Sequence, residues 1–172
     1  MNAFGKEVRA TKPTLTPQEA ERLVNTYADL ILRLSYTYLK STQDAQDICQ
    51  TVFLKFVEKP RPFASPEHEK AWVLRAAVNA CKDLLKSKWR RSSVPLENAA
   101  PGPAPEPADG SLLAAVEALP PDYRLAIYLF YYEGYTAKEI AKLLGVPAAT
   151  VYTRLSRGRE RLRRELESEG YE

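Results

Sequence analysis

The chain has 172 residues, of which 45% are hydrophobic and 27% are charged, and its formal net charge is +3. This balance excludes an intrinsically disordered chain, and the length allows one domain or two small ones. No apolar run approaches the roughly 18 residues of a membrane span, and the N-terminus carries no signal-peptide hydrophobic segment. We therefore expect a cytoplasmic protein.

Helical periodicity recurs along the chain and sustained strand alternation is lacking, so the sequence predicts an all-α fold. Thr16, Pro17 and Glu19 have the order of an N-cap, a first-turn proline and a capping-box acid, and they predict a helix through Tyr38. A second helix is expected from about 41–44 to 58. A third is expected from about 69 to 87, after a break that contains three prolines.

Residues 93–111 hold five prolines, two glycines and few large apolar residues, which is typical of a flexible linker. The sequence thus predicts two small helical domains joined by a proline-rich linker. The expected boundaries are an N-terminal tail over 1–15, a first domain over 16–92, the linker over 93–111 and a second domain over 112–172.

In the second domain, helices are expected over about 112–119 and 121–132, and a third begins at Thr136. Thr136 and Glu139 form a capping box, Gly145 supplies a turn, and Pro147 suits the first position of a further helix. Two helices joined by a short turn with glycine are typical of a helix-turn-helix, whose second helix enters the major groove of DNA.

A helical wheel separates two faces of this last helix. Thr153, Ser156 and Arg157 point outward, where an arginine can bind guanine through two hydrogen bonds. The alternative interpretation is an arginine-rich helix that is simply solvated. The apolar stripe lies within about 60° of Val151 and is expected to be buried: Leu155, Gly158, Leu162 and Leu166.

The first domain carries two further patterns. In the second helix a stripe with Asp47, Gln50 and Leu54 lies beside the core face, which suits a protein contact, although a plain surface helix is the alternative. Residues 82–91 contain five basic residues. Trp89 lies within this patch, and Trp72 precedes it in the same predicted helix. Aromatic side chains among positive charges suit stacking on exposed bases, although Trp72 is expected in the core.

The sequence contains few other residues that could bind a metal or act in catalysis. Cys49 and Cys81 fit no metal spacing and are expected to be small buried apolar side chains. His68 lies between Glu67 and Glu69, but neighbouring residues on a helix point in different directions, so no metal site is predicted. We expect no catalytic residues, no cofactor, no small-molecule substrate and no enzyme.

In this order the patterns resemble the extracytoplasmic-function sigma factors of the sigma-70 family, from about Thr16 to Leu166. The first domain is similar to region two in DAQDICQTVFLKF and AWVLRAAVNACKDLLKSKWRR. The second is similar to region four in LPPDYRLAIYLFYYEGYTAKEIAKLLGVPAATVYTRLSRGRERLR. The resemblance implies a transcription initiation factor that binds core RNA polymerase at the clamp of its largest subunit, binds promoter DNA, and is silenced by an anti-sigma factor.

The resemblance also implies a role for individual residues. Residues 66–70 would lie in or beside the loop that receives a flipped promoter base. The residues that would contact core polymerase are Asp44, Asp47, Gln50, Phe53 and Leu54. The minus-10 element would be bound by Asn79, Asp83, Lys86, Lys88, Arg90 and Arg91. The minus-35 element would be bound by Tyr152, Thr153, Arg154, Ser156, Arg157 and Arg161. The alternative function is a stand-alone helix-turn-helix regulator, which would bind duplex DNA without polymerase.

Overall fold

The computed structural model describes residues 14–92, 112–168 and 170. All secondary structure within these residues is helical, as predicted. The predicted linker and most of the predicted N-terminal tail lie outside the described residues. No helix in the described part of the chain is both long enough and apolar enough to cross a membrane.

Three helices form a first bundle: α1 (Pro17–Leu39), α2 (Thr42–Glu58) and α3 (Pro66–Ser92). The Thr16 hydroxyl caps α1 by accepting a hydrogen bond from the Glu19 amide, 3.2 Å away, as the sequence predicts. The third helix is longer than predicted at both ends. It begins earlier because Ser65 accepts from the His68 amide at 3.2 Å, and it continues to Ser92 because lysine and arginine are good helix formers.

A second bundle contains α4 (Leu112–Glu117), α5 (Pro121–Ile127), η1 (Tyr128–Tyr132), α6 (Ala137–Leu144) and α7 (Ala148–Ser168). The sequence predicts one helix over 121–132, but its last five residues form a π-helical turn, η1. The Glu133 amide bonds the Tyr128 carbonyl, 3.2 Å away and five residues back. The rings of Tyr128 and Tyr132 stack with their centroids 5.2 Å apart.

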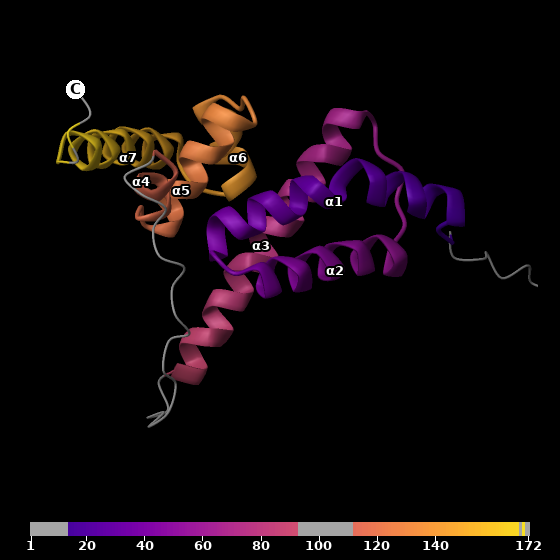
Figure 1. Ribbon diagram of the computed structural model, residues 1–172. Helices are drawn as coiled ribbons and strands as arrows, with labels where there is room; N and C mark the ends of the chain where they lie inside the picture. The colour runs from indigo at the N-terminus through magenta and orange to yellow at the C-terminus, as the bar shows by residue number, and fades with distance from the viewer. Residues whose placement is uncertain (1–13, 93–111, 169, 171–172) are drawn as a thin grey trace, which may run out of the picture.

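The two bundles lie against each other, with α1 packed on α5 and α3 packed on α6 (Figure 1). Buried apolar side chains of both bundles form one continuous cluster, which runs from Leu23 in α1 to Leu155 in α7. The C-terminal end of α3 projects beyond α1 and α2 (Figure 1). Burial of this kind contributes about 25 cal/mol per Å² of apolar surface and is the main stabilising term of the fold.

The cysteines and the first tryptophan have different environments. Cys81 is fully buried, as expected, whereas Cys49 is only half-buried. That expectation was wrong for Cys49 because its side chain lies on the wall of a surface groove between α1 and α2. Trp72 is half-buried and packs on Phe56 and Phe63, with ring centroids 4.6 Å and 5.8 Å away.

A polar network fastens the start of α3 to α1. The Glu69 carboxylate, in a residue only 9% exposed, accepts hydrogen bonds from the Arg22 guanidinium at 2.8 and 2.9 Å and from the Tyr27 hydroxyl at 2.7 Å. The bonds from Arg22 hold the pKa of Glu69 below its usual value, against the opposing effect of burial. The carboxylate is therefore ionised in the folded protein.

We expect Glu69→Gln to lower the free energy of unfolding by about 1–2 kcal/mol near neutral pH, a modest value because Arg22 remains partly exposed to water. A carboxyl whose pKa is lower in the folded state stabilises the fold above its unfolded pKa. This contribution disappears as the pH falls through the folded pKa, so the difference between the two proteins should shrink in acid.

Urea unfolding at pH ~7 and pH ~3 measures this difference. Glu67→Gln is the matched control, since Glu67 is an exposed neighbour in the same helical turn and should change stability little. If Glu69→Gln lowered the free energy of unfolding by the same amount at both pH values, the charge of the Glu69 carboxylate would not be what stabilises the contact between α1 and α3.

Candidate functional site

An apolar groove of about 610 Å³ runs between α1 and α2. It exists because α2 carries a second apolar stripe beside its core face, which leaves Leu54 and Val57 more than half exposed. The groove brings together three residues of the predicted polymerase set, Gln50, Phe53 and Leu54. Its lining consists of Val24, Ala28, Leu32, Gln46, Cys49, Gln50, Phe53, Leu54 and Val57.

The two acidic residues predicted for the same contact do not line the groove. Asp47 is exposed on α2 and accepts a hydrogen bond from Gln43 Nε2 at 3.4 Å. Asp44 lies in the first turn of α2, where its carboxylate pairs with Lys88 of α3. The structure thus joins one residue predicted to bind polymerase to one predicted to bind minus-10 DNA.

The outer face of α3 presents the other predicted minus-10 residues. Asn79, Asp83 and Lys86 are exposed and lie on one helical face at spacings of four and three residues. Arg90 and Arg91 are exposed at the C-terminal end of α3, beside Trp89, which is 74% exposed. This face combines positive charge with an exposed aromatic ring, which suits nucleic acid.

A hollow of about 380 Å³ adjoins Asn79 and is lined by basic and aromatic side chains. Arg61 lies over the Trp72 ring, 5.2 Å from its centroid. Arg61 and Arg75 were not among the residues predicted from the sequence for this surface. Arg75 precedes Asn79 by four residues, so helical spacing would have found it, whereas Arg61 lies in a loop with no periodicity. The lining consists of Lys55, Glu58, Lys59, Arg61, Trp72, Arg75, Ala76 and Asn79.

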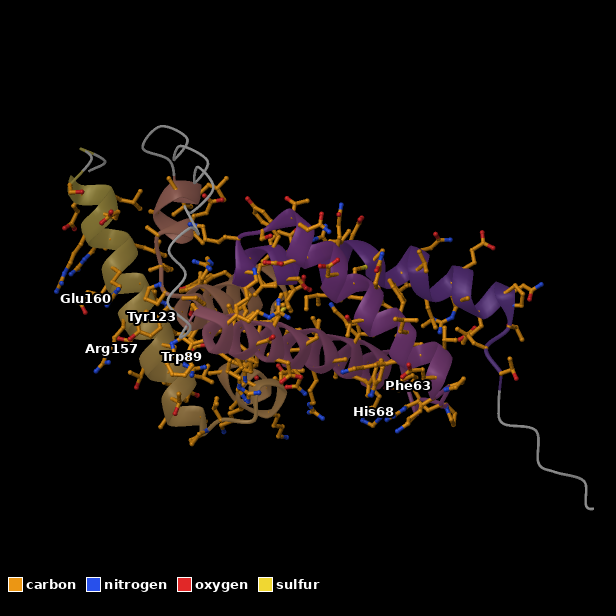
Figure 2. All side chains as sticks on the ribbon, turned by 90° about the horizontal axis from the view of Figure 1, so that it is seen from below. Phe63, His68, Trp89, Tyr123, Arg157 and Glu160 are labelled. Carbon is orange, nitrogen blue, oxygen red and sulfur yellow. The ribbon has the colours of Figure 1, made fainter. Side chains whose placement is uncertain are left out.

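The first turn of α3, residues 66–70, lies directly beside the loop 59–65. Figure 2 shows Phe63 and His68 at the opposite end of the molecule from Arg157 and Glu160 of α7. Within the described residues, no three His, Cys, Asp or Glu side chains come together as a metal site requires.

In the second bundle, α6 and α7 have the predicted helix-turn-helix layout. The capping box is present, since the Glu139 amide donates to the Thr136 hydroxyl at 3.3 Å and the Thr136 amide donates to the Glu139 carboxylate at 2.8 Å. Gly145 closes α6 in the left-handed region with φ of 65°, where a residue without Cβ avoids strain. Pro147 then precedes the first helical residue, Ala148.

The two faces of α7 are those that the helical wheel predicts. Val151, Leu155 and Gly158 are buried, and Leu162 and Leu166 are half-buried. The outward face of the first three turns carries Tyr152, Thr153, Ser156 and Arg157, all exposed.

Five of the six arginines between 154 and 164 are engaged within the protein. Arg154, whose side chain is only 18% exposed, pairs with Asp122 of α5 at 3.4 Å. Arg161 lies over the Tyr123 ring of α5 at 5.4 Å. Both predicted DNA contacts therefore hold α7 against α5. Arg159 donates a hydrogen bond to the Tyr131 hydroxyl. Arg163 pairs with Glu167, and Arg164 pairs with Glu160.

Arg157 differs from these five. Among the described residues it has no ion pair, hydrogen bond or ring contact, and Figure 2 shows it projecting from α7. An exposed guanidinium without a partner in the protein is available for an external acceptor such as a base edge or a phosphate.

Gly158 allows α7 to approach α5 closely. A Cβ at this position would lie 3.2 Å from Ile127 Cγ1. We expect Gly158→Val to lower the free energy of unfolding by about 2 kcal/mol, because the branched side chain forces the helices apart. Gly158→Ala is the control and should be nearly neutral, since a gain in helix propensity of about 1 kcal/mol offsets the tight contact.

Chemical denaturation of both variants measures the change. If the Gly158→Val variant were as stable as the native protein, the result would contradict the close packing of α7 on α5.

Each of the two bundles matches a known protein family. Residues 23–91 match the family described as Sigma-70 region 2, and residues 109–162 match Sigma-70, region 4. The ECF RNA polymerase sigma factor SigW of Bacillus subtilis is 31% identical over 162 residues, which cover 84% of this chain and 87% of SigW. The ECF RNA polymerase sigma factor SigE of Mycolicibacterium smegmatis is 30% identical over 154 residues, and the chain spans 60% of its length.

Two solved structures share the fold. The sigma factor RpoE from Bartonella quintana, in complex with the anti-sigma factor NepR, superposes with a TM-score of 0.68 at 22% identity, covering 87% of this chain and 98% of RpoE. CnrH, in complex with the cytosolic domain of CnrY, gives 0.58 at 18% identity, covering 90% of this chain and 92% of CnrH. From the sequence matches, the chain belongs to the extracytoplasmic-function sigma factors of the sigma-70 family.

Proposed function

We propose that this protein binds core RNA polymerase and directs it to specific promoters by reading their minus-35 elements and opening their minus-10 elements. The observation that carries the proposal is the combination, in the order typical of the family, of an apolar groove on α2 with separate DNA-binding faces on α3 and α7. A stand-alone regulator does not require a surface that binds polymerase.

The groove between α1 and α2 is the proposed docking site for the clamp of the polymerase largest subunit. Phe53 and Leu54 supply apolar contact area, and Gln50 supplies hydrogen-bonding groups at the edge of this area. Asp47, exposed one turn before Gln50, adds a carboxylate for a basic residue of the partner. Asp44 could contact the polymerase only after its ion pair with Lys88 is broken.

The face of α3 is the proposed site for the melted minus-10 strand. Asn79 and Asp83 offer hydrogen-bonding groups to unpaired bases, and Lys86, Arg90 and Arg91 offer positive charge to phosphates. The hollow with Arg61, Trp72 and Arg75 extends this surface toward the loop 59–65, where a flipped base could stack.

The exposed start of α7 is the proposed reader of the minus-35 element. Tyr152, Thr153, Ser156 and Arg157 face outward, and Arg157 is free to bind a guanine. Arg154 and Arg161 would add phosphate contacts after leaving their α5 partners.

In this proposal the protein itself makes and breaks no covalent bond, and it acts in the cytoplasm beside the polymerase. The first domain, 16–92, and the second domain, 112–172, bind at separate points, joined by residues 93–111. Polymerase binding raises the effective concentration of each DNA-binding face near its element, so that two modest affinities combine.

We also propose control by an anti-sigma factor. The related folds of RpoE and CnrH are described in complexes with NepR and the cytosolic domain of CnrY. An anti-sigma protein that covers the α1–α2 groove would block the polymerase contact directly.

Run-off transcription tests the proposal. Purified bacterial core polymerase is supplied with a pool of promoter fragments, with and without this protein. Specific transcripts should appear only when the protein is present. A protein that neither binds core polymerase nor changes its transcripts, yet shifts duplex DNA unaided, is a stand-alone regulator instead.

A further inference from the structure

The first turns of α7 carry a row of three exposed side chains that line one hollow. Ala149, Thr153 and Arg157 follow one another at intervals of four residues, so they lie one above another on the outward face of the helix. Ala149 has no part in the proposed function. The hollow has a volume of about 360 Å³, and α5 contributes one residue to it, Tyr123, which lies beside α7 (Figure 2). The lining consists of Tyr123, Ala149, Thr150, Thr153, Arg154 and Arg157.

Thr153 offers a methyl group rather than a hydroxyl proton to a partner in this hollow. Its Oγ1 donates a hydrogen bond to the Ala149 carbonyl, 3.0 Å away and one helical turn earlier. The hydroxyl proton is therefore not available to an acceptor on a base edge. The Cγ2 methyl takes no part in this bond, and the exposed side chain of Ala149 is itself a single methyl group. Two methyl groups thus follow each other on the outward face.

The charged side chains of the hollow are not equally available. Arg154 is only 18% exposed and pairs with Asp122 at 3.4 Å, which holds its guanidinium against α5. Arg157 forms no ion pair, hydrogen bond or ring contact within the described part of the chain. The hollow therefore offers two methyl groups and, one turn further along α7, one guanidinium that is available to DNA.

Base edges in the major groove differ in what they present to such a surface. Thymine carries a methyl group there, whereas adenine and cytosine present amino donors and guanine presents two acceptors. A thymine methyl against the methyls of Ala149 and Thr153 is removed from water without loss of a hydrogen bond. An amino group in the same place exchanges its hydrogen bonds with water for methyl groups, which cannot replace them. The hollow therefore favours thymine.

The spacing along α7 relates this thymine to the guanine that Arg157 is proposed to bind. Four helical residues separate Thr153 from Arg157, which is a rise of about 6 Å. Successive base pairs are about 3.4 Å apart, so the two side chains face positions within about two base pairs of each other. Thr153 and Arg157 can therefore contact neighbouring bases at the same time.

We propose that Thr153, together with Ala149, binds the methyl group of a thymine in the minus-35 element, within about two base pairs of the guanine bound by Arg157. This inference rests on the proposed function and names a base that the minus-35 face selects. Thr153 is then a specificity-determining residue and not a phosphate contact. Burial of one methyl group corresponds to about fourfold in affinity, so loss of the methyl from either the protein or the base should have an effect of that size.

Deoxyuridine pairs with adenine as thymine does but lacks the methyl group, so it tests the contact directly. The holoenzyme is assembled from core polymerase and the full chain, and fluorescence anisotropy measures its affinity for a promoter fragment selected in the run-off assay. Thymines of the minus-35 element are replaced by deoxyuridine one at a time, on both strands. One replacement should weaken binding about fourfold, and replacements between the two elements should have no effect.

Thr153→Ser keeps the hydroxyl that bonds the Ala149 carbonyl and removes only the methyl group. It should bind the unmodified promoter about fourfold more weakly than the native protein, and the deoxyuridine that weakens the native complex should weaken this one no further. Thr26→Ser is the matched control, because Thr26 is exposed on α1 and its hydroxyl donates to the Arg22 carbonyl at 2.7 Å in the same way. It should keep the native affinity and the native response to deoxyuridine.

The methyl contact is overturned if no deoxyuridine in the minus-35 element weakens binding, or if Thr153→Ser responds to deoxyuridine as the native protein does. Both results leave the run-off assay unaffected. If the protein instead fails to direct core polymerase but binds duplex DNA unaided, the proposed function is wrong, and the same replacements in that duplex test Thr153. A protein that binds duplex DNA in neither setting contradicts both proposals.

Discussion

Leu54→Asp is expected to lower the affinity of the protein for core RNA polymerase by about 100-fold, or about 3 kcal/mol. Leu54 is 57% exposed in the free protein and lines the apolar α1–α2 groove together with Phe53. The substitution removes apolar area and places a carboxylate where a partner would exclude water, and burial of an unpaired charge is costly. Fluorescence anisotropy of labelled protein titrated with core polymerase measures the change.

Tyr36→Asp is the control for this variant. Tyr36 is an exposed aromatic residue of α1 that does not line the groove, so a carboxylate there should leave polymerase affinity nearly unchanged. Equal losses from both substitutions would show a general effect of charge on the first bundle. Full affinity of Leu54→Asp would exclude the groove as the docking site.

Arg157→Ala is expected to reduce promoter-specific transcription by about 10- to 100-fold, because one bidentate contact of arginine with guanine contributes about 1–3 kcal/mol of discrimination. Arg157 is the arginine of the 154–164 cluster that has no partner among the described residues, so its loss should not disturb the fold. Run-off transcription with core polymerase measures the loss, and thermal unfolding should remain that of the native protein.

Arg164→Ala is the matched control, since it removes the same charge from α7 about two turns beyond Arg157, where Arg164 pairs with Glu160. Its effect should be small and the same on all promoters, as for a residue that contributes only general charge. If Arg157→Ala weakened transcription no more than Arg164→Ala, the outward face of α7 would not be the reader of promoter sequence.

Much of the helical architecture follows from local signals in the sequence. The Thr16 and Thr136 caps mark helix starts through side-chain hydrogen bonds that depend on a few neighbouring residues only. The buried stripe of α7 follows from a period of 3.6 residues, and the positions of Val151, Leu155 and Gly158 confirm it. Such features require no knowledge of the rest of the fold.

Other features depend on tertiary contacts that a local pattern does not contain. The engagement of Arg154 by Asp122 joins residues on different helices, and neither position signals the other. The half-exposed Cys49 reflects a groove formed by two helices together. Arg124, which fastens α5 to the end of α1, lies in a short helix that looks like an ordinary amphipathic segment.

The proposed roles of the three surfaces converge on one event, the polymerase-dependent opening of promoter DNA. Permanganate footprinting measures this directly, because it modifies unpaired thymines. On a promoter selected in the run-off assay, reactive thymines should appear around the minus-10 element only when core polymerase and this protein are both present. Thymines that stay unreactive in the complete mixture, or that become reactive with the protein alone, would contradict the account.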